Sequence, residues 1–135
     1  MKATDLMIDD WVKIVDDAPT MPREYHRVDW IRTGELGLDN RKIVTYPFIE
    51  PIPLTPEILE KNGFIKKKNF MQLGNFDNPP LIMWHLEEEK ILHHLKHELE
   101  IHHAKNGIHV SINVEYVHEL QHALRMCGIK KEIVL

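Results

Sequence analysis

Short segments of alternating apolar and polar residues, separated by turn residues, determine what this chain of 135 residues can fold into. The segments Trp11–Val15, Tyr25–Ile31 and Lys42–Ile49 are rich in β-branched and aromatic residues, which is typical of strands. No apolar run approaches the ~18 residues that a membrane span needs. The pattern therefore predicts a β-rich domain without a membrane segment.

Turn residues divide the first part of the chain. Gly34, Gly37 and Asp39-Asn40 predict one reversal between the second and third segments, and Pro47 predicts a bend or an edge in the third. We therefore expect a small, strongly bent β-sheet of the SH3-like kind over residues 1–54.

A short helix is predicted next. Thr55-Pro56-Glu57 supplies a hydroxyl N-cap, a proline at the first helical position and an acid in the first turn, and Asn62-Gly63 ends the helix. Strand-like residues follow at Phe64–Leu73 and Leu81–Leu86.

The stretch Ile91–His103 fits both a helical and a strand period. Asn106-Gly107, the strongest two-residue hairpin signal, favours strands. With these two residues as the loop, His103 faces Val110 and Leu99 faces Val114, so the apolar residues of both strands share one side.

The last predicted element is an amphipathic helix over Val114–Met126, capped by Asn113 and ended by Gly128. The apolar tail, residues 133–135, is expected to pack. The whole is an α+β protein with a small β subdomain over residues 1–54 and an α+β subdomain over residues 55–135, joined in one compact body.

Charge and cysteine content narrow the function classes. The 17 basic and 21 acidic residues give a net charge of −4, and the densest basic run, Lys66–Lys68, has no aromatic residues between its lysines. This excludes a basic stripe for nucleic acid and gives no reason to expect binding to an anionic membrane.

The single cysteine, Cys127, cannot form an internal disulfide, and the first twelve residues contain no signal-peptide core. We expect a cytoplasmic protein.

Residues 118–122 read His-Glu-Leu-Gln-His, which matches the H-E-x-x-H pattern of zinc hydrolases. Two histidines four apart lie on one helical face, so His118 and His122 are candidate zinc ligands, and Glu119 is the candidate base that activates a metal-bound water.

The sequence around this motif argues against catalysis. A catalytic zinc needs three protein ligands, and Glu132 is the sole carboxylate after His122. The extended pattern fails, because Arg125 replaces its glycine and Gly128 its last histidine. Helical spacing also predicts a buried stripe of Val117, Leu120, Leu124 and Cys127, and a solvated face of His118, Glu119, His122 and Arg125.

The chain has ten histidines, and several lie close together before and after the predicted hairpin. A metal-binding surface is one hypothesis, formed by His93, His94, His97, His102, His103 and His109. In the strand interpretation these side chains divide between the two faces, with His93, His97 and His103 on the apolar side and His94 and His102 on the polar side. That division favours histidines with ordinary structural roles, and Cys127 is likewise expected to be a small core residue.

Three stretches carry a resemblance: Asp5–Val12 (DLMIDDWV), Pro51–Phe64 (PIPLTPEILEKNGF) and Tyr116–Leu135 (YVHELQHALRMCGIKKEIVL). Together they resemble a group of small, uncharacterised proteins of gut-dwelling anaerobic bacteria. The resemblance implies a bacterial, cytoplasmic protein and carries no reaction with it.

The sequence therefore favours a non-enzymatic protein-binding or accessory module without a cofactor. Two alternatives stay open. One is a zinc-dependent hydrolase using His118, Glu119 and His122, and the other is a non-catalytic histidine-surface metal binder.

Overall fold

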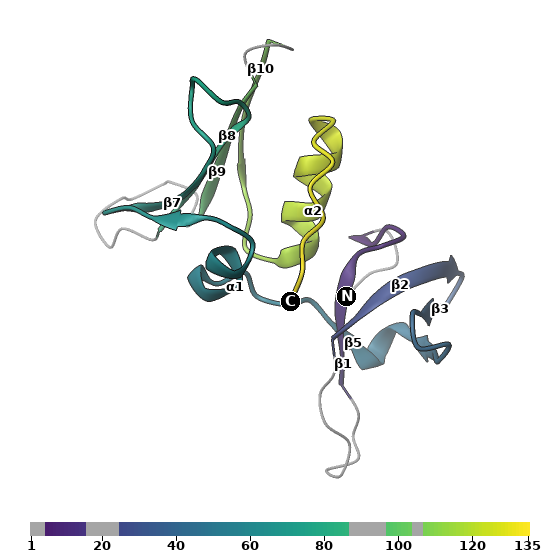
Figure 1. The fold of residues 1–135 in the computed structure, drawn as a ribbon. Helices are drawn as coiled ribbons and strands as arrows, with labels where there is room; N and C mark the ends of the chain where they lie inside the picture. The colour runs from purple at the N-terminus through teal and green to yellow at the C-terminus, as the bar shows by residue number, and fades with distance from the viewer. Residues whose placement is uncertain (1–4, 16–24, 87–96, 104–106) are drawn as a thin grey trace. The chain divides into compact units, whose positions relative to one another are not determined.

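The computed structural model describes residues 5–15, 25–86, 97–103 and 107–135 (Figure 1). It divides into two compact units. Unit 1 comprises Met1–Pro53 and Tyr116–His122, and unit 2 comprises Leu54–Glu115 and Ala123–Leu135. Within the described residues there are two five-stranded antiparallel sheets and two α-helices, a mixed composition that agrees with the α+β class.

Unit 1 contains the first sheet, whose strand order is β4-β3-β2-β1-β5 (Figure 1). The strands are β1 (Trp11–Ile14), β2 (Tyr25–Arg32), β3 (Glu35–Leu38), β4 (Ile43–Thr45) and β5 (Ile49–Glu50). The 3-10 helix η2 (Tyr46–Phe48) separates β4 from β5. The predicted third strand is therefore bent at Pro47, where the proline stands at the start of η2.

Strand β3 corrects the prediction of a single reversal between Gly34 and Asn40. A turn at Gly34, where φ is +84°, leads into β3, and a second turn leads out of it. Gly37 lies inside β3, paired with Trp30 of β2. A side chain at position 37 would clash with the indole ring of Trp30, so this glycine serves packing and not a turn.

The core of unit 1 forms between the inward faces of its strands. It consists of Leu6, Val12, Val28, Leu36, Leu38 and Ile49, all at most 6% exposed. Ile14, Ile31, Val44 and Tyr46 pack against this cluster. In β1 and β2, the alternating pattern thus separates residues that lie in the core from residues that lie toward the surface.

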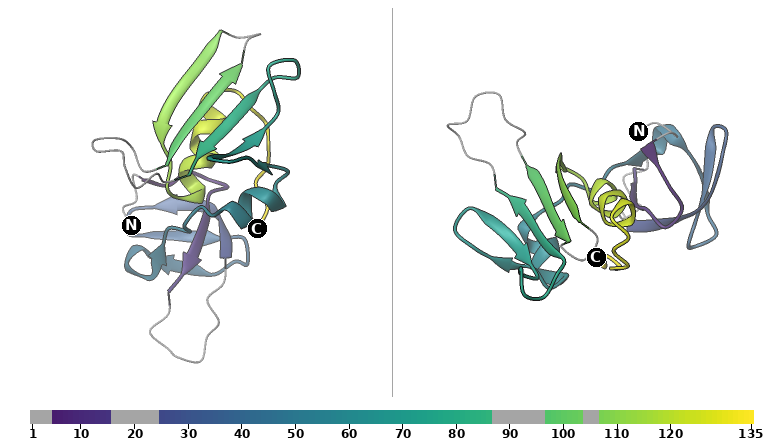
Figure 2. Two further views of the ribbon diagram at one scale, coloured as in Figure 1. Left: turned by 90° about the vertical axis from the view of Figure 1, so that its left-hand side faces the viewer. Right: turned by 90° about the horizontal axis from the view of Figure 1, so that it is seen from above.

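Unit 2 contains an antiparallel meander with the order β10-β9-β8-β7-β6 (Figure 2). The strands are β6 (Ile65–Lys66), β7 (Phe70–Leu73), β8 (Leu81–His85), β9 (Glu98–His103) and β10 (Ile108–Asn113). The predicted strand Phe64–Leu73 is in fact two strands, because residues 67–69 turn the chain back. Helix α1 (Pro56–Lys61) begins as predicted, with the Thr55 hydroxyl accepting from the Ile58 amide at 3.3 Å.

The β9–β10 pair confirms strands over Glu98–His103, but not the predicted register. His103 pairs with Ile108 and Leu99 with Ile112, so four residues and not two separate the strands. The shift is by two positions, which keeps every side chain on its predicted face. Residues 91–96 and Asn106 lie outside the described part of the chain.

Helix α2 (Val117–Met126) starts three residues later than predicted. Asn113 ends β10, and its side chain accepts from the His97 amide, so it does not cap the helix. Gly128 ends it as predicted, because the Ile129 amide donates to the Leu124 carbonyl and the Gly128 amide donates to Arg125. Among the described residues, no helix has the length and apolar character needed to cross a membrane.

The Trp30–Gly37 contact yields the first prediction. Gly37→Ala should lower the free energy of unfolding by about 1–3 kcal/mol, because the new methyl group overpacks the indole ring. In a Trp30→Ala background the same change should cost less than about 0.5 kcal/mol. Urea unfolding of the four proteins measures both values. Equal costs in the two backgrounds would contradict the observed packing.

Candidate functional site

The His-Glu-Leu-Gln-His segment forms the first turns of α2 and belongs to unit 1. Tyr116 precedes the helix, and the Glu119 carboxylate accepts a hydrogen bond from the Tyr116 amide at 3.0 Å. This is half of a capping box, in which the third helical residue reaches back to the N-cap. Glu119 therefore has a structural role at the helix start.

His122 lies beside Asp10, a residue 112 positions away and fully buried. His122 Nε2 is 2.6 Å from Asp10 Oδ2, and the Met7 amide donates to the same oxygen at 2.7 Å. Because a carboxylate only accepts, His122 donates through its Nε2 hydrogen. A buried carboxylate needs such donors, since an unpaired charge away from water is strongly unfavourable.

Gln121 continues this connection. Its side chain is buried, and its amide oxygen accepts from the Trp11 amide while its nitrogen donates to the Asp9 carbonyl, both at 2.9 Å. The side chain thus pairs with the main chain on either side of Asp10, much as a neighbouring strand does. Together, Gln121 and His122 hold the start of α2 against the N-terminal segment.

His118 departs from the prediction of a solvated face, because it is only 6% exposed. Its ring stacks on Tyr116 at 5.9 Å, and its Nδ1 is buried without a hydrogen bond to any described residue. Burial lowers the pKa of His118, against the carboxylates of Asp10, Glu119 and Asp5, which favour the charged ring. His122 adds to the lowering.

The predicted apolar stripe, in contrast, is confirmed. Val117, Leu120, Leu124 and Cys127 are all at most 4% exposed. Burial raises the pKa of the Cys127 thiol, which disfavours the reactive thiolate. Cys127 is a core residue, as expected.

A third potential metal ligand beside His118 and His122 is Asp10, which comes from the N-terminal segment. Nevertheless, these three side chains do not bring three ligand atoms within 4.8 Å of one another. Among the described residues, only His85, Glu98 and Glu100 in unit 2 do so. In this arrangement Glu119, Gln121 and His122 make hydrogen bonds that hold the start of α2 in place.

Asp10 and Gln121 are the site residues that sequence reasoning missed. The signal for Asp10 was its position directly before an apolar strand, where a carboxylate is costly unless it is paired. Gln121 occupies a variable position of the motif, so the pattern itself gives it no role. Neither contact can be derived from local spacing, because both partners are more than 100 residues apart.

Comparison of the chain with protein-family models, curated proteins and solved structures gives no significant match.

The burial of His118 yields a pH prediction. Because its pKa in the folded state lies below the ordinary 6.5, the unfolded chain takes up its proton more readily. The contribution of the neutral ring to stability is complete above about pH 6.5 and is lost as the pH falls. His118→Phe should therefore lose less unfolding free energy between pH 7.5 and 5.5 than the parent protein.

The measurement is urea unfolding at both pH values with EDTA present. His109→Gln, which replaces an exposed histidine, is the control and should match the parent. An equal loss for His118→Phe and the parent would show that His118 is not the group that resists protonation.

Proposed function

We propose that this protein is a non-enzymatic protein-binding module whose unit 1 has an SH3-like fold. The strand order β4-β3-β2-β1-β5, with a 3-10 helix between β4 and β5, supports this fold assignment because it is the arrangement of SH3-like sheets. Such folds serve many functions, so the function is argued from surface residues.

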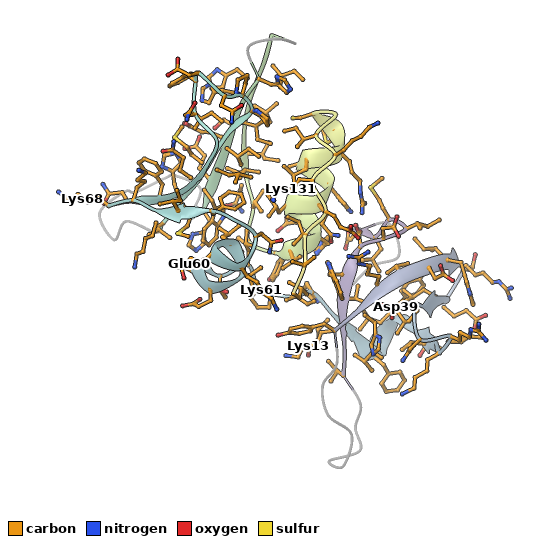
Figure 3. The ribbon with its side chains drawn as sticks, in the orientation of Figure 1. Lys13, Asp39, Glu60, Lys61, Lys68 and Lys131 are labelled. Carbon is orange, nitrogen blue, oxygen red and sulfur yellow. The ribbon has the colours of Figure 1, made fainter. Side chains whose placement is uncertain are left out.

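The observation that carries the proposal is an aromatic and cationic strip on the outer face of β1 and β2. Trp11 pairs with Arg27 and Lys13 with Tyr25, while Val12 and His26 between them belong to the opposite face of the strands and are buried. The Arg27 guanidinium lies 4.8 Å from the centre of the Trp11 ring, and Tyr25 is 47% exposed. Lys13 projects from β1 in Figure 3.

This composition suits a protein partner. Tryptophan, tyrosine and arginine are enriched at interfaces, where rigid aromatic rings contribute contact area at small entropic cost. The cations favour a partner segment that carries acidic as well as apolar side chains. Trp84, by contrast, is buried and donates to the Val114 carbonyl, so it serves the core of unit 2.

The contacts of the H-E-x-x-H residues support the non-enzymatic part of the proposal. A zinc hydrolase needs the glutamate for its water and both imidazoles for its metal. Here Glu119 accepts from the Tyr116 amide and His122 donates to Asp10. These hydrogen bonds compete with the activation of water by Glu119 and with the binding of zinc by His122.

A photo-crosslinking amino acid at position 25, in cells that naturally contain the protein, tests the proposal. We expect one discrete protein adduct, which Lys13→Glu should reduce several-fold by repelling an acidic partner. The same crosslinker at Phe76, a 72% exposed aromatic residue of unit 2, is the matched control and should not give this adduct. Identical adducts at both positions, or none at position 25, would refute the binding strip.

A further inference from the structure

The outer face of the unit 2 sheet gathers imidazoles and carboxylates from two neighbouring strands. Leu81 of β8 pairs with His102 of β9, and Met83 pairs with Glu100. By the same alternation His85 and Glu98 belong to this face. The opposite face carries Ile82, Trp84, Leu99 and Ile101, all at most 1% exposed, so the polar cluster faces away from the core.

The distances within this cluster suit a metal ion. His85, Glu98 and Glu100 each offer one ligand atom, and these atoms all lie within 4.8 Å of one another. Glu100 Oε2 lies 3.5 Å from His85 Nε2 and 3.6 Å from His102 Nε2. Two ligands of a tetrahedral zinc are about 3.3 Å apart, given bonds of about 2.0–2.1 Å.

The surroundings of one ligand nitrogen give a further indication. His85 Nε2 is a buried atom that makes no hydrogen bond within the described part of the chain, although it lies 3.5 Å from Glu100 Oε2. A buried polar atom without a well-formed hydrogen bond is unfavourable, and so are two like charges close together on one face of a sheet. A cation between these groups removes both penalties, because it accepts the nitrogen lone pair and neutralises the carboxylates.

Neighbouring side chains hold the ligands in position. The Ser111 hydroxyl donates to Glu98 Oε1. The His85 ring packs against Phe70 at 5.7 Å, and the His102 ring is stacked with His109 at 4.2 Å. Hydrogen bonds from surrounding residues orient metal ligands, and Ser111 provides one such bond to Glu98.

We propose that His85, Glu98 and Glu100 bind a first-row divalent transition metal ion, with His102 as a fourth ligand. Imidazole nitrogen favours zinc and its neighbours over calcium and magnesium, which prefer shells of oxygen alone. The site shares only His102 with the histidine surface expected from the sequence. Its other ligands are His85, Glu98 and Glu100, whereas His103 lies on the opposite face, and His93 and His94 lie outside the described residues.

Titration with zinc chloride tests this site. The protein is purified without an affinity tag, stripped with EDTA and desalted, and binding is followed by calorimetry. We expect one equivalent of zinc whose affinity falls at least tenfold in His85→Ala and in Glu100→Gln, while calcium at the same concentration does not compete. His103→Gln removes a histidine of the same strand from the opposite face, and should bind as the parent does.

A second readout separates lost binding from lost folding. Zinc should raise the thermal midpoint of the parent and of His103→Gln, since a ligand that binds only the folded state stabilises it. It should not raise the midpoint of His85→Ala, whose circular dichroism should match that of the parent. Zinc binding that survives in the His85→Ala/Glu100→Gln double variant, or its absence from the parent, would overturn the proposal.

Discussion

A buried carboxylate constrains the N-terminal unit more than any other group. Asp10 is fully buried, so the fold must bring donors to it. One donor is local, the Met7 amide, but another is the imidazole of His122 from the far end of the sequence. The Asp10–His122 contact thereby fixes where residues 116–122 lie within unit 1, and Gln121 extends the connection along the main chain.

The Asp10–His122 contact also shows what surrounds the H-E-x-x-H pattern in the fold. The motif requires a helical face, and it has one, but the groups that surround this face decide its chemistry. Here these groups are the Asp10 carboxylate, which accepts a hydrogen bond from His122, and the Tyr116 amide, which donates one to the Glu119 carboxylate. Residues of this pattern thus fasten the first turns of α2 to the N-terminal segment of unit 1.

Local signals predicted much of the fold. Thr55 caps α1, Gly128 ends α2, and alternation separates core from surface in β1, β2 and β9, because each depends on neighbouring residues. Strand β3 was missed because Gly37 resembles a turn residue, although Trp30 across the sheet requires it. The predicted β9–β10 register differs from the observed one by two positions, because Asn106-Gly107 predicted a two-residue loop.

The candidate sites were less predictable than the fold, and for one reason. Asp10 meets His122, and His85 meets Glu100, only through tertiary pairing that no spacing rule encodes. The sequence identified His118, Glu119 and His122 as a group but placed His118 on a solvated face. Tertiary contacts made it one of the buried polar residues.

Long-range proton–nitrogen NMR of the histidine rings, before and after one equivalent of zinc, tests the central claim most directly. Our account predicts that His122 carries its hydrogen on Nε2, and that zinc leaves the ring nitrogens of His118 and His122 unchanged while shifting those of His85. Zinc-dependent shifts at both His118 and His122 would contradict it, and would identify α2 as a metal-binding helix.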